Sequence, residues 1–301
     1  MFVTKSHPKV SIIIPTYNRA DYIIETIQSI QRQTYQNWEL IIIDDGSTDN
    51  TEEVIAALED EKIQFYKAGR TGVTGRLKNS GLRIASGELI AFLDSDDLWA
   101  VTKLEKQVAA LKQYPEAGFC LSGGYNFKEL NEPVDYFFKQ REGTKYGNIF
   151  LGCFRSEAHG FTQALLFRKE CIGQTGEFKE VKTFSDVDFI ISLAYHFNAI
   201  LLYEPLVYRR LHQSNYINST WVKSIHEGID IIEEYKSKKL LPSPVAKNAL
   251  FRLYINFGEK YLLYKDPKKA IGKFFKAWQN KPFSIIPYKK MAKTIFHYLF
   301  K

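Results

Sequence analysis

Apolar and polar residues alternate in blocks over the first hundred residues of the chain, and the blocks have two different periods. Short runs rich in β-branched residues lie at 10–14, 39–43, 63–67 and 88–93. Between them, apolar residues recur at helical spacing over about 20–33, after 47 and over about 74–85. Strands that alternate with helices in this way are typical of βαβ units, in which helices cover both faces of a mostly parallel sheet. The pattern therefore predicts an α/β fold.

The rest of the chain is less regular at first and then helical. Two strands of a mixed sheet, a helix and a strand pair are expected at 121–127, 160–167, 185–197 and 199–212. After about residue 218 the pattern is helical, with breaks at 240–244 and near Pro282. These signals predict two parts, residues 1–215 and a C-terminal helical region at 216–301.

Composition narrows the class of protein. The formal net charge of +7 favours a polyanionic partner, an anionic membrane surface or a phosphate-bearing ligand, and does not decide among them. Cys120, Cys153 and Cys171 are far apart and support neither a disulfide framework nor a zinc site, which fits a reducing cytosol. No apolar run reaches the roughly 18 residues that a membrane span needs, and the N-terminus lacks the apolar core of a signal peptide. We expect a soluble or peripheral protein.

Polar residues follow the ends of the predicted parallel strands, where open sheets of this kind bind ligands. The second strand ends in "DDGSTD". A capping interpretation makes Ser47 or Thr48 the N-cap of the next helix, with Glu52 near the capping-box position. Capping leaves Asp44 and Asp45 unexplained. An acid at this position can instead accept a hydrogen bond from a ribose hydroxyl or a base N–H.

The fourth apolar run ends in "LDSDDL", which places three carboxylates within four residues. Carboxylates this close repel one another and resist burial unless a positive charge neutralises them. Asp94 and Asp96 can aim at one point, and oxygen ligands of this kind suit Mg²⁺ or Mn²⁺ together with a substrate diphosphate. The alternative is an exposed acidic loop that caps a helix beginning near Val101. Asp97 is expected to be only such a cap.

Three further places carry candidate chemistry beside ordinary explanations. Arg76 and Lys78, at the start of a helix, are either solvated charges or contacts to a phosphate or a base. Asp186 and Asp188 either favour the positive end of the helix that they begin or supply a general base. His212 is a surface histidine unless the strand that it ends returns to the "DSDD" edge.

Five segments together resemble the inverting nucleotide-sugar glycosyltransferases of family 2, which have the GT-A fold. They are "VSIIIPTYNRADYI", "IQSIQRQTYQNWELIIIDDGSTD", "GRLKNSG", "GELIAFLDSDD" and "SDVDF", in the family's order over about residues 9–213. The resemblance implies a GT-A, Rossmann-like, mostly parallel sheet flanked by helices in residues 1–215. The C-terminal helical region at 216–301 would be an appendage to this catalytic domain.

The resemblance also implies roles for individual residues. Donor contacts fall on Pro15, Tyr17, Asp45, Arg76, Asp94 and Ser95. Asp96 and His212 would contact the metal, and Asp186 would be the general base. The chain departs from the family's pattern twice: Ser185 stands where Glu is common, which keeps Asp188 as an alternative base, and "GRLKNSG" replaces the more usual "ARNxG".

The function that this resemblance implies is a metal-dependent inverting glycosyltransferase that uses Mg²⁺ or Mn²⁺. It would move a sugar from a nucleoside-diphosphate donor, with a UDP-sugar favoured, to a hydroxyl of a saccharide or lipid-linked acceptor in cell-surface polysaccharide synthesis. One alternative is a nucleotidyltransferase on a related fold, which would need a glycine-rich phosphate loop that "PTYNRADY" lacks. Another is a non-catalytic nucleotide-sugar binding module, which would not need "SDVDF". No nucleic-acid partner is expected.

The C-terminal segment at 265–301 contains ten lysines and the single acid Asp266, interleaved with aromatic residues. One interpretation is a helical appendage that packs its aromatic side chains on the rest of the protein. The other is a peripheral contact with an anionic membrane surface, where each lysine contributes about 1 kcal/mol. The expected location is accordingly the cytoplasm, either free or on the inner face of the cell membrane.

Overall fold

The structure is a computed structural model that describes residues 2, 6–138, 141–158, 160–181, 184–212 and 217–299, with only the backbone of 217–220 and 298–299. It divides into two compact units. The first contains residues 1–150 and 158–215, and the second contains residues 151–157 and 216–301. The short segment 151–157 therefore belongs with the C-terminal helices, although nothing in its sequence indicated this.

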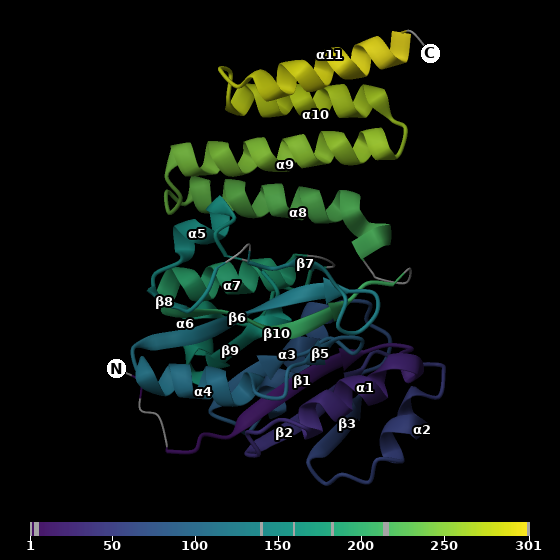
Figure 1. Ribbon diagram of the computed structural model, residues 1–301, viewed down its shortest axis with the longest axis vertical. Coiled ribbons are helices and arrows are strands. Elements are labelled where there is room, and N and C mark those ends of the chain that lie inside the picture. The colour runs from purple at the N-terminus through teal and green to yellow at the C-terminus, as the bar shows by residue number, and fades with distance from the viewer. Residues whose placement is uncertain are drawn as a thin grey trace. The chain divides into compact units, whose positions relative to one another are not determined.

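A single twisted sheet forms the centre of the first unit (Figure 1). Its strand order is β3 (Ile63–Lys67), β2 (Trp38–Asp44), β1 (Val10–Thr16), β4 (Leu89–Phe92), β9 (Leu165–Arg168), β6 (Ala117–Phe127), β10 (Asn198–Arg210) and β5 (Leu98–Trp99). The first four strands in this order are parallel, as are β6 and β10, whereas β9 runs antiparallel to both of its neighbours. Two outer strands, β7 (Pro133–Tyr136) and β8 (Thr144–Gly147), pair with β6 and β10. The predicted mostly parallel α/β sheet is confirmed.

Helices cover both faces of this sheet, because successive strand residues point to opposite sides. On one side, Ile12 and Ile14 of β1 share a buried cluster with residues of α1 (Ala20–Gln31), α2 (Thr51–Ala56) and α4 (Lys103–Gln113). On the other side, Ile13 meets α3 (Thr74–Ile84) at Gly81, where a Cβ atom would lie 2.5 Å from Cγ2 of Ile13. Phe189 of α7 (Ser185–His196) stacks nearby on Phe178. Short helices η1 (Thr162–Ala164), η2 (Lys169–Cys171) and α6 (Ile172–Thr175) complete the unit.

Residues 199–212 do not form the expected strand pair. Residues 198–210 are one long strand, β10, which pairs in parallel with β6. The register of this pairing shifts on either side of Pro205. Because proline has no N–H to donate, it interrupts the ladder without ending the strand. The apparent break in the sequence is therefore an irregularity inside a single strand.

Neither the capping interpretation of Ser47 or Thr48 nor the cap expected at Asp97 is correct. Helix α2 begins at Thr51 with Asn50 as its N-cap residue, and the Ser47 hydroxyl instead donates to Asp44 Oδ1 at 2.5 Å. Asp97 caps no helix, because the N-cap residue of α4 is Thr102. The Asp97 side chain is buried, and its Oδ1 accepts the backbone N–H of Arg210 at 2.9 Å.

The second unit contains the short helix α5 (Phe150–Arg155) from residue 151 onward and four longer helices, α8 (Ile217–Ser237), α9 (Ser243–Leu263), α10 (Pro267–Asn280) and α11 (Ile285–Leu299). The long helices lie side by side in chain order (Figure 1). The expected breaks near 240–244 and Pro282 are confirmed. A third break precedes α10, where the Asp266 side chain accepts the N–H of Lys269 at 3.0 Å. In the part of the chain that the structure describes, no helix combines the length and apolarity needed to cross a bilayer.

Candidate active site at the strand ends

Asp44 builds the turn that follows β2. Its Oδ2 accepts the N–H groups of Gly46 at 3.0 Å and Ser47 at 2.9 Å. Gly46 has a φ of 78°, and a Cβ atom there would lie 3.1 Å from the backbone nitrogen of Arg70. Both facts favour glycine at this position. The first acid of "DDGS" therefore has a structural role, and the turn that it builds places Gly46 beside the backbone of Arg70.

Asp45 is buried beneath residues 70–72. Its Oδ1 accepts the N–H and hydroxyl of Thr71 at 2.6 and 2.7 Å, and its Oδ2 accepts from Gly72 at 2.9 Å and from the Arg70 guanidinium. The same guanidinium lies 3.7 Å from the centre of the Tyr17 ring. Arg70 therefore covers two of the residues expected to contact a nucleoside. The third, Pro15, lies in β1 beside β2.

Asp94 and Ser95 follow β4, as the sequence predicts. Asp94 is half-buried, its Oδ2 accepts a hydrogen bond from Gln163 Nε2, and Ser95 is buried beside it. Burial raises the pKa of the Asp94 carboxyl to about 6; the nearby Lys78 ammonium opposes this rise, and the carboxylate of Asp186 adds to it. Asp94 and Asp186, which are 92 positions apart in the sequence, therefore lie close enough to interact electrostatically.

Asp96 lies at the meeting point of three chain segments. Its Oδ2 is 3.0 Å from His212 Nε2, just beyond β10, and accepts from Arg19 Nε at 3.2 Å. The His212 ring stacks on Tyr22 at 5.1 Å between centroids. The strand before His212 thus returns to the "DSDD" edge, which is the condition under which this histidine becomes a candidate ligand.

Asp97 supports this edge from the interior. Burial raises the pKa of its carboxyl well above the ordinary range, and the carboxylates of Asp96 and Asp94 raise it further. Its contact with the Arg210 N–H joins the turn after β4 to the end of β10. Asp97 therefore holds the turn that carries Asp94 and Asp96 against the end of β10.

The donor atoms at this edge fit Mg²⁺ or Mn²⁺. No described residue donates a hydrogen bond to Oδ1 of Asp94 or Asp96, so each carboxylate keeps a free oxygen. Among the described residues, no three acidic, histidine or cysteine side chains converge on one point. Mg²⁺ in nucleotide sites uses one or two carboxylates and completes its shell with substrate phosphates and water. Asp94 and Asp96 offer carboxylate oxygens of this kind, and the His212 ring nitrogen lies 3.0 Å from Asp96 Oδ2.

Asp186 begins α7 and is held by two side chains from distant segments. Lys78 Nζ lies 2.8 Å from each of its carboxylate oxygens, and the Thr162 hydroxyl donates to its Oδ2 at 2.7 Å. The side chain of Asp186 keeps 29% of its surface exposed. The reserve candidate Asp188 is more buried and pairs with Lys179 at 3.1 Å. Of the two acids, Asp186 is the more accessible.

Arg76 lies away from these contacts. Its side chain is exposed and donates to Glu180 at 2.9 Å. In the register of "ARNxG", set by Asn79 and Gly81, the motif's arginine position is occupied by Lys78. The assignment of Arg76 to the nucleotide base therefore stays a prediction without a contact that supports it.

Sequence reasoning missed the importance of Lys78, Thr162, Gln163 and Arg19. For Lys78 a signal existed, because Gly75, Lys78 and Leu82 recur at the spacing of one helix face and all three are buried. A charge on such a face needs a buried partner. Thr162 and Gln163 have no comparable signal, because their role depends on where η1 lies in the folded chain.

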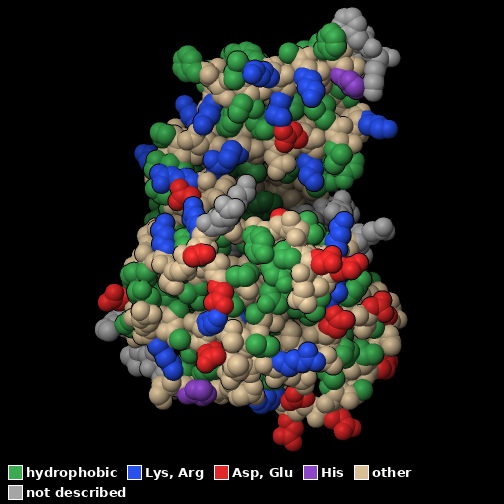
Figure 2. All heavy atoms as spheres, viewed as in Figure 1, with side chains coloured by type: hydrophobic (Ala, Val, Ile, Leu, Met, Phe, Trp, Pro, Cys, Tyr) green, Lys and Arg blue, Asp and Glu red, His purple; other side chains and the backbone are tan. Residues whose placement is uncertain are grey.

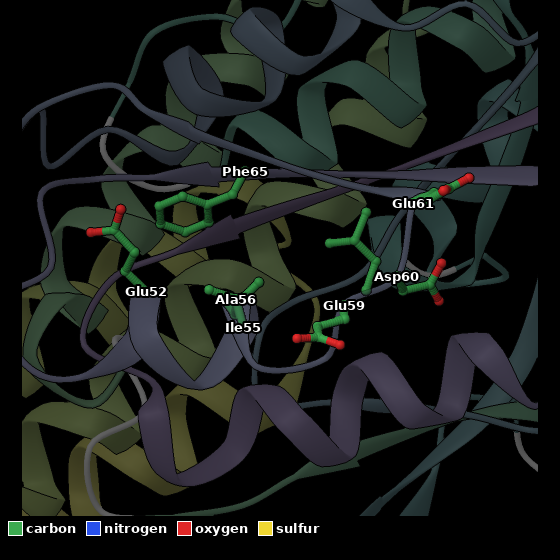
Figure 3. Close-up of a pocket in the computed structure, with 8 residues that line it drawn as sticks. Glu52, Ile55, Ala56, Glu59, Asp60, Glu61 and Phe65 are labelled. Carbon is green, nitrogen blue, oxygen red and sulfur yellow. The ribbon is translucent and has the colours of Figure 1, made fainter.

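A pocket of about 410 Å³ lies elsewhere, between α2 and β3 (Figure 3). Four apolar and four acidic residues line it: Ile55, Ala56, Ile63, Phe65, Glu52, Glu59, Asp60 and Glu61. None of them is a candidate site residue. The chemistry at the strand ends and this pocket are thus separate features of the first unit.

Residues 11–172, more than half of the chain, match the family model of glycosyl transferase family 2. The chain therefore belongs to glycosyl transferase family 2 and is a glycosyltransferase. This decides against the two alternatives, a nucleotidyltransferase and a non-catalytic binding module.

Curated relatives agree with this assignment. The putative teichuronic acid biosynthesis glycosyltransferase TuaG of Bacillus subtilis is 30% identical over 73% of this chain and 85% of its own. The UDP-Glc:alpha-D-GlcNAc-diphosphoundecaprenol beta-1,3-glucosyltransferase WfgD of Escherichia coli is 43% identical over 48% of this chain. The match spans only 56% of WfgD, and it spans 20% of an uncharacterised glycosyltransferase of Rickettsia bellii.

Solved structures share the fold. S. aureus TarS 1–349 in complex with UDP-GlcNAc superposes with a TM-score of 0.69 over 95% of this chain and 89% of that chain, at 19% identity. The mannosyltransferase PcManGT of Pyrobaculum calidifontis, solved with GDP-Man and Mn²⁺, gives 0.60 over 98% and 81%, also at 19% identity. The predicted GT-A architecture is confirmed at the level of the fold.

Proposed function

We propose that this protein is a metal-dependent inverting glycosyltransferase that transfers a sugar from a nucleoside-diphosphate donor to a hydroxyl of a saccharide or lipid-linked acceptor. One observation carries the proposal. The Asp186 carboxylate is partly exposed, is held by Lys78 and Thr162, and interacts electrostatically with Asp94 at the strand ends. The residues that we assign as general base and donor-binding acid thus lie near each other at one edge of the sheet.

The nucleoside of the donor would bind at the ends of β1 and β2. Tyr17 offers a ring face, and Asp45 offers hydrogen-bond acceptors once Arg70 moves away. Pro15, Ser95 and Arg76 complete the proposed donor contacts. A UDP-sugar is the favoured donor, since WfgD is named for UDP-Glc and TarS was solved with UDP-GlcNAc.

Asp96 and His212 would hold Mg²⁺ or Mn²⁺, with Asp94 beside them on the ribose and diphosphate. Such an ion, when bound, acts as a Lewis acid that stabilises the departing diphosphate by several kcal/mol. Arg19 contributes a second positive charge, because it already contacts the Asp96 carboxylate. The donor set and the adjacent arginine together suit a nucleoside diphosphate as leaving group.

Asp186 would accept the proton of the acceptor hydroxyl while that oxygen attacks the anomeric carbon. The bond from this carbon to the diphosphate oxygen breaks in the same step, so the anomeric centre inverts. General-base catalysis of this kind contributes roughly 10² to 10⁴ in rate. The hydrogen bonds from Lys78 and Thr162 direct the carboxylate for this task.

The acceptor that we favour is a lipid-linked saccharide in cell-surface polysaccharide synthesis. WfgD and WfaP of Escherichia coli are named for an acceptor on diphosphoundecaprenol, and TuaG for teichuronic acid biosynthesis. Such an acceptor lies in a membrane, so the enzyme would work at its surface.

The second unit supports a contact with an anionic membrane. Phe274 is buried and serves the packing role, whereas Phe283, Tyr288 and Phe296 are exposed. On the face shown in Figure 2, lysine side chains lie among hydrophobic ones over α10 and α11. Basic helices with exposed aromatic residues bind membrane interfaces through both kinds of side chain. We therefore propose that 265–301 contacts anionic lipid.

Vesicle sedimentation tests the membrane proposal. The full chain should sediment with phosphatidylglycerol vesicles at low salt and less with phosphatidylcholine vesicles. Phe283→Ser combined with Phe296→Ser should weaken binding, while Tyr136→Ser, an exposed aromatic residue of β7, should not. Equal binding to both lipids, or none to either, would leave 265–301 with the packing role alone.

The catalytic proposal is tested with a panel of UDP-, GDP- and dTDP-sugars, with and without Mn²⁺, and a short-chain lipid that carries GlcNAc diphosphate. We expect transfer from a UDP-sugar that requires the metal. Asp186→Asn should lose about 10² or more in kcat with little change in donor KM, because a general base acts on the transition state. If Asp188→Asn shows this pattern and Asp186→Asn does not, the base is misassigned.

A further inference from the structure

Lys78 is a fully buried lysine whose charge is directed at the proposed base. Its ammonium has three N–H donors, and they are matched by three acceptors at 2.8 Å: both carboxylate oxygens of Asp186 and the hydroxyl of Thr162. The rings of Phe92 and Phe178 lie 5.5 Å from the same nitrogen. The side chain is thus fully buried, with two aromatic rings near its charged end.

We propose that Lys78 is a positioning residue for catalysis, which fixes the direction in which the Asp186 lone pairs point. This inference rests on the proposed function, in which Asp186 is the general base. Lys78 does not touch the substrate in this account and acts through Asp186. A carboxylate at the start of a helix can otherwise rotate, and a small error in the geometry of a reacting group costs about 10²-fold in rate.

Packing alone does not explain a lysine here. Removing an ammonium from water costs several kcal/mol, which a single ion pair offsets only when its geometry is good. Methionine or leucine would fill a space beside two phenylalanine rings without that cost. This cost occurs at a place where the partner, Asp186, is a partly exposed carboxylate of the candidate site, which points to a functional use of the charge.

A second buried lysine provides the comparison. Lys103 is also fully buried, donates to Gln107 Oε1 at 2.8 Å and lies 3.8 Å from the centre of the Trp99 ring. Its hydrogen-bond partner is a neutral amide, and no carboxylate pairs with it among the described residues. The two lysines are therefore alike in burial and aromatic contact and differ in their connection to Asp186.

Helix α3 and turn η1 connect this pair to the donor side of the site. Asn79, the next residue in α3, exchanges two hydrogen bonds of 2.9 Å with the backbone of Phe178. In η1, Thr162 bonds to Asp186, and the adjacent Gln163 donates to Asp94. The base and the donor-binding acid are thus held by consecutive residues, so their spacing is set by the backbone of one turn.

The test compares Lys78→Met, Lys78→Arg and the control Lys103→Met in the UDP-sugar transfer assay with the GlcNAc-diphosphate lipid. Lys78→Met should lower kcat by about 10²-fold with donor and acceptor KM nearly unchanged, since positioning acts on the reacting geometry. Lys78→Arg, which keeps the charge, should recover at least part of this loss. Lys103→Met should leave kcat near the wild-type value.

A double-mutant cycle separates positioning from general structural support. In the Asp186→Asn background, Lys78→Met should cause almost no further loss, because residues that act as a unit are not additive. Additive losses, or a similar loss in Lys103→Met, would overturn the inference. Thr162→Val removes the hydroxyl that donates to Asp186 and provides a second variant if Lys78→Met does not fold. It should lower kcat by about 5- to 10-fold, since the carboxylate keeps only Lys78 as a partner.

The outcomes distinguish this inference from the proposed function. If Asp186→Asn loses transfer while Lys78→Met and Thr162→Val both keep it, only the positioning role falls. If Asp186→Asn keeps transfer, the base assignment falls, and the role of Lys78 falls with it.

Discussion

Replacement of Lys103 by methionine should make the protein more stable at neutral pH. The gain in unfolding free energy should be larger below pH 7 than above it. Lys103 of α4 is fully buried beneath the Trp99 ring, with the amide of Gln107 as its hydrogen-bond partner. Burial lowers the pKa of this lysine from 10.5 to about 7. Methionine is close to lysine in length and carries no charge to desolvate.

The sign of the pH dependence follows from the direction of this shift. Between pH 7 and 10.5 the unfolded chain binds a proton at Lys103 that the folded chain has released, so this residue makes stability rise with pH. Below pH 7 the ammonium is charged in both states and its full cost is present. That cost is up to about 5 kcal/mol at 1.36 kcal/mol per pKa unit. Lys103→Met should remove it.

Urea unfolding at intervals from pH 6 to pH 10 measures the effect. The difference in unfolding free energy between Lys103→Met and wild type should be largest near pH 6 and should shrink by about 1.4 kcal/mol per pH unit above 7. Lys112→Met, on the exposed side of the same helix, is the matched control and should show a small difference that does not depend on pH. A Lys103→Met protein that is less stable than wild type at pH 6 would refute this reasoning.

Three other changes have clear expected outcomes. Arg70→Ala should tighten UDP binding by about 2- to 5-fold in calorimetry, because an exposed cation–π contact of about 0.5–1 kcal/mol no longer covers Tyr17; weaker binding would show instead that Arg70 holds the ligand. Burial by itself raises the pKa of Glu39, but hydrogen bonds from Lys9, Ser11 and Ser86 lower it to about 2. The ionised carboxylate therefore contributes about 3 kcal/mol to the unfolding free energy above pH 4.5, and this contribution should be lost as the pH falls through 2. Acid unfolding of Glu39→Gln should show a shallower slope, and an unchanged slope would contradict the assignment. Gly81→Ala should cost about 1–3 kcal/mol in urea unfolding, because its Cβ would lie 2.5 Å from Ile13, and a neutral substitution would mean that α3 can move off β1.

Much of the fold was predictable because its signals are local. The runs at 10–14 and 39–43 are buried along their whole length as β1 and β2, so their apolar character alone marks them as central strands. The errors in strand and helix assignment arose where contacts with distant parts of the chain determine the local structure. Pro205 looked like a turn and lies within one strand, and Ser47 looked like a helix cap and bonds to Asp44. A short window of sequence reveals neither the pairing of β10 with β6 nor the hydrogen bond from Ser47 to Asp44.

The acids of the candidate site were indicated by the sequence, and the contacts of its cations were not. Asp94 and Asp96 stand out because carboxylates this close resist burial at the end of an apolar strand, whereas Asp186 was singled out by the resemblance to the family. Lys78 was left open between a solvated charge and a phosphate or base contact, and Arg19 was not singled out, because their partners depend on which helix faces which strand end. Gln163 and Thr162 act through one turn of 3₁₀ helix, for which composition and periodicity carry no signal.

Metal-dependent binding of UDP tests the central claim most directly. Thermal unfolding would be followed for wild type, Asp96→Asn and Glu53→Gln, an exposed acid of α2, each with UDP and with or without Mn²⁺. Ligand at 100 times its dissociation constant stabilises the bound form by about 2.7 kcal/mol, which gives a readable shift in Tm. Wild type and Glu53→Gln should show a shift that requires Mn²⁺, and a folded Asp96→Asn should lose it. An unchanged Mn²⁺-dependent shift in Asp96→Asn would contradict a nucleotide and metal site at these strand ends.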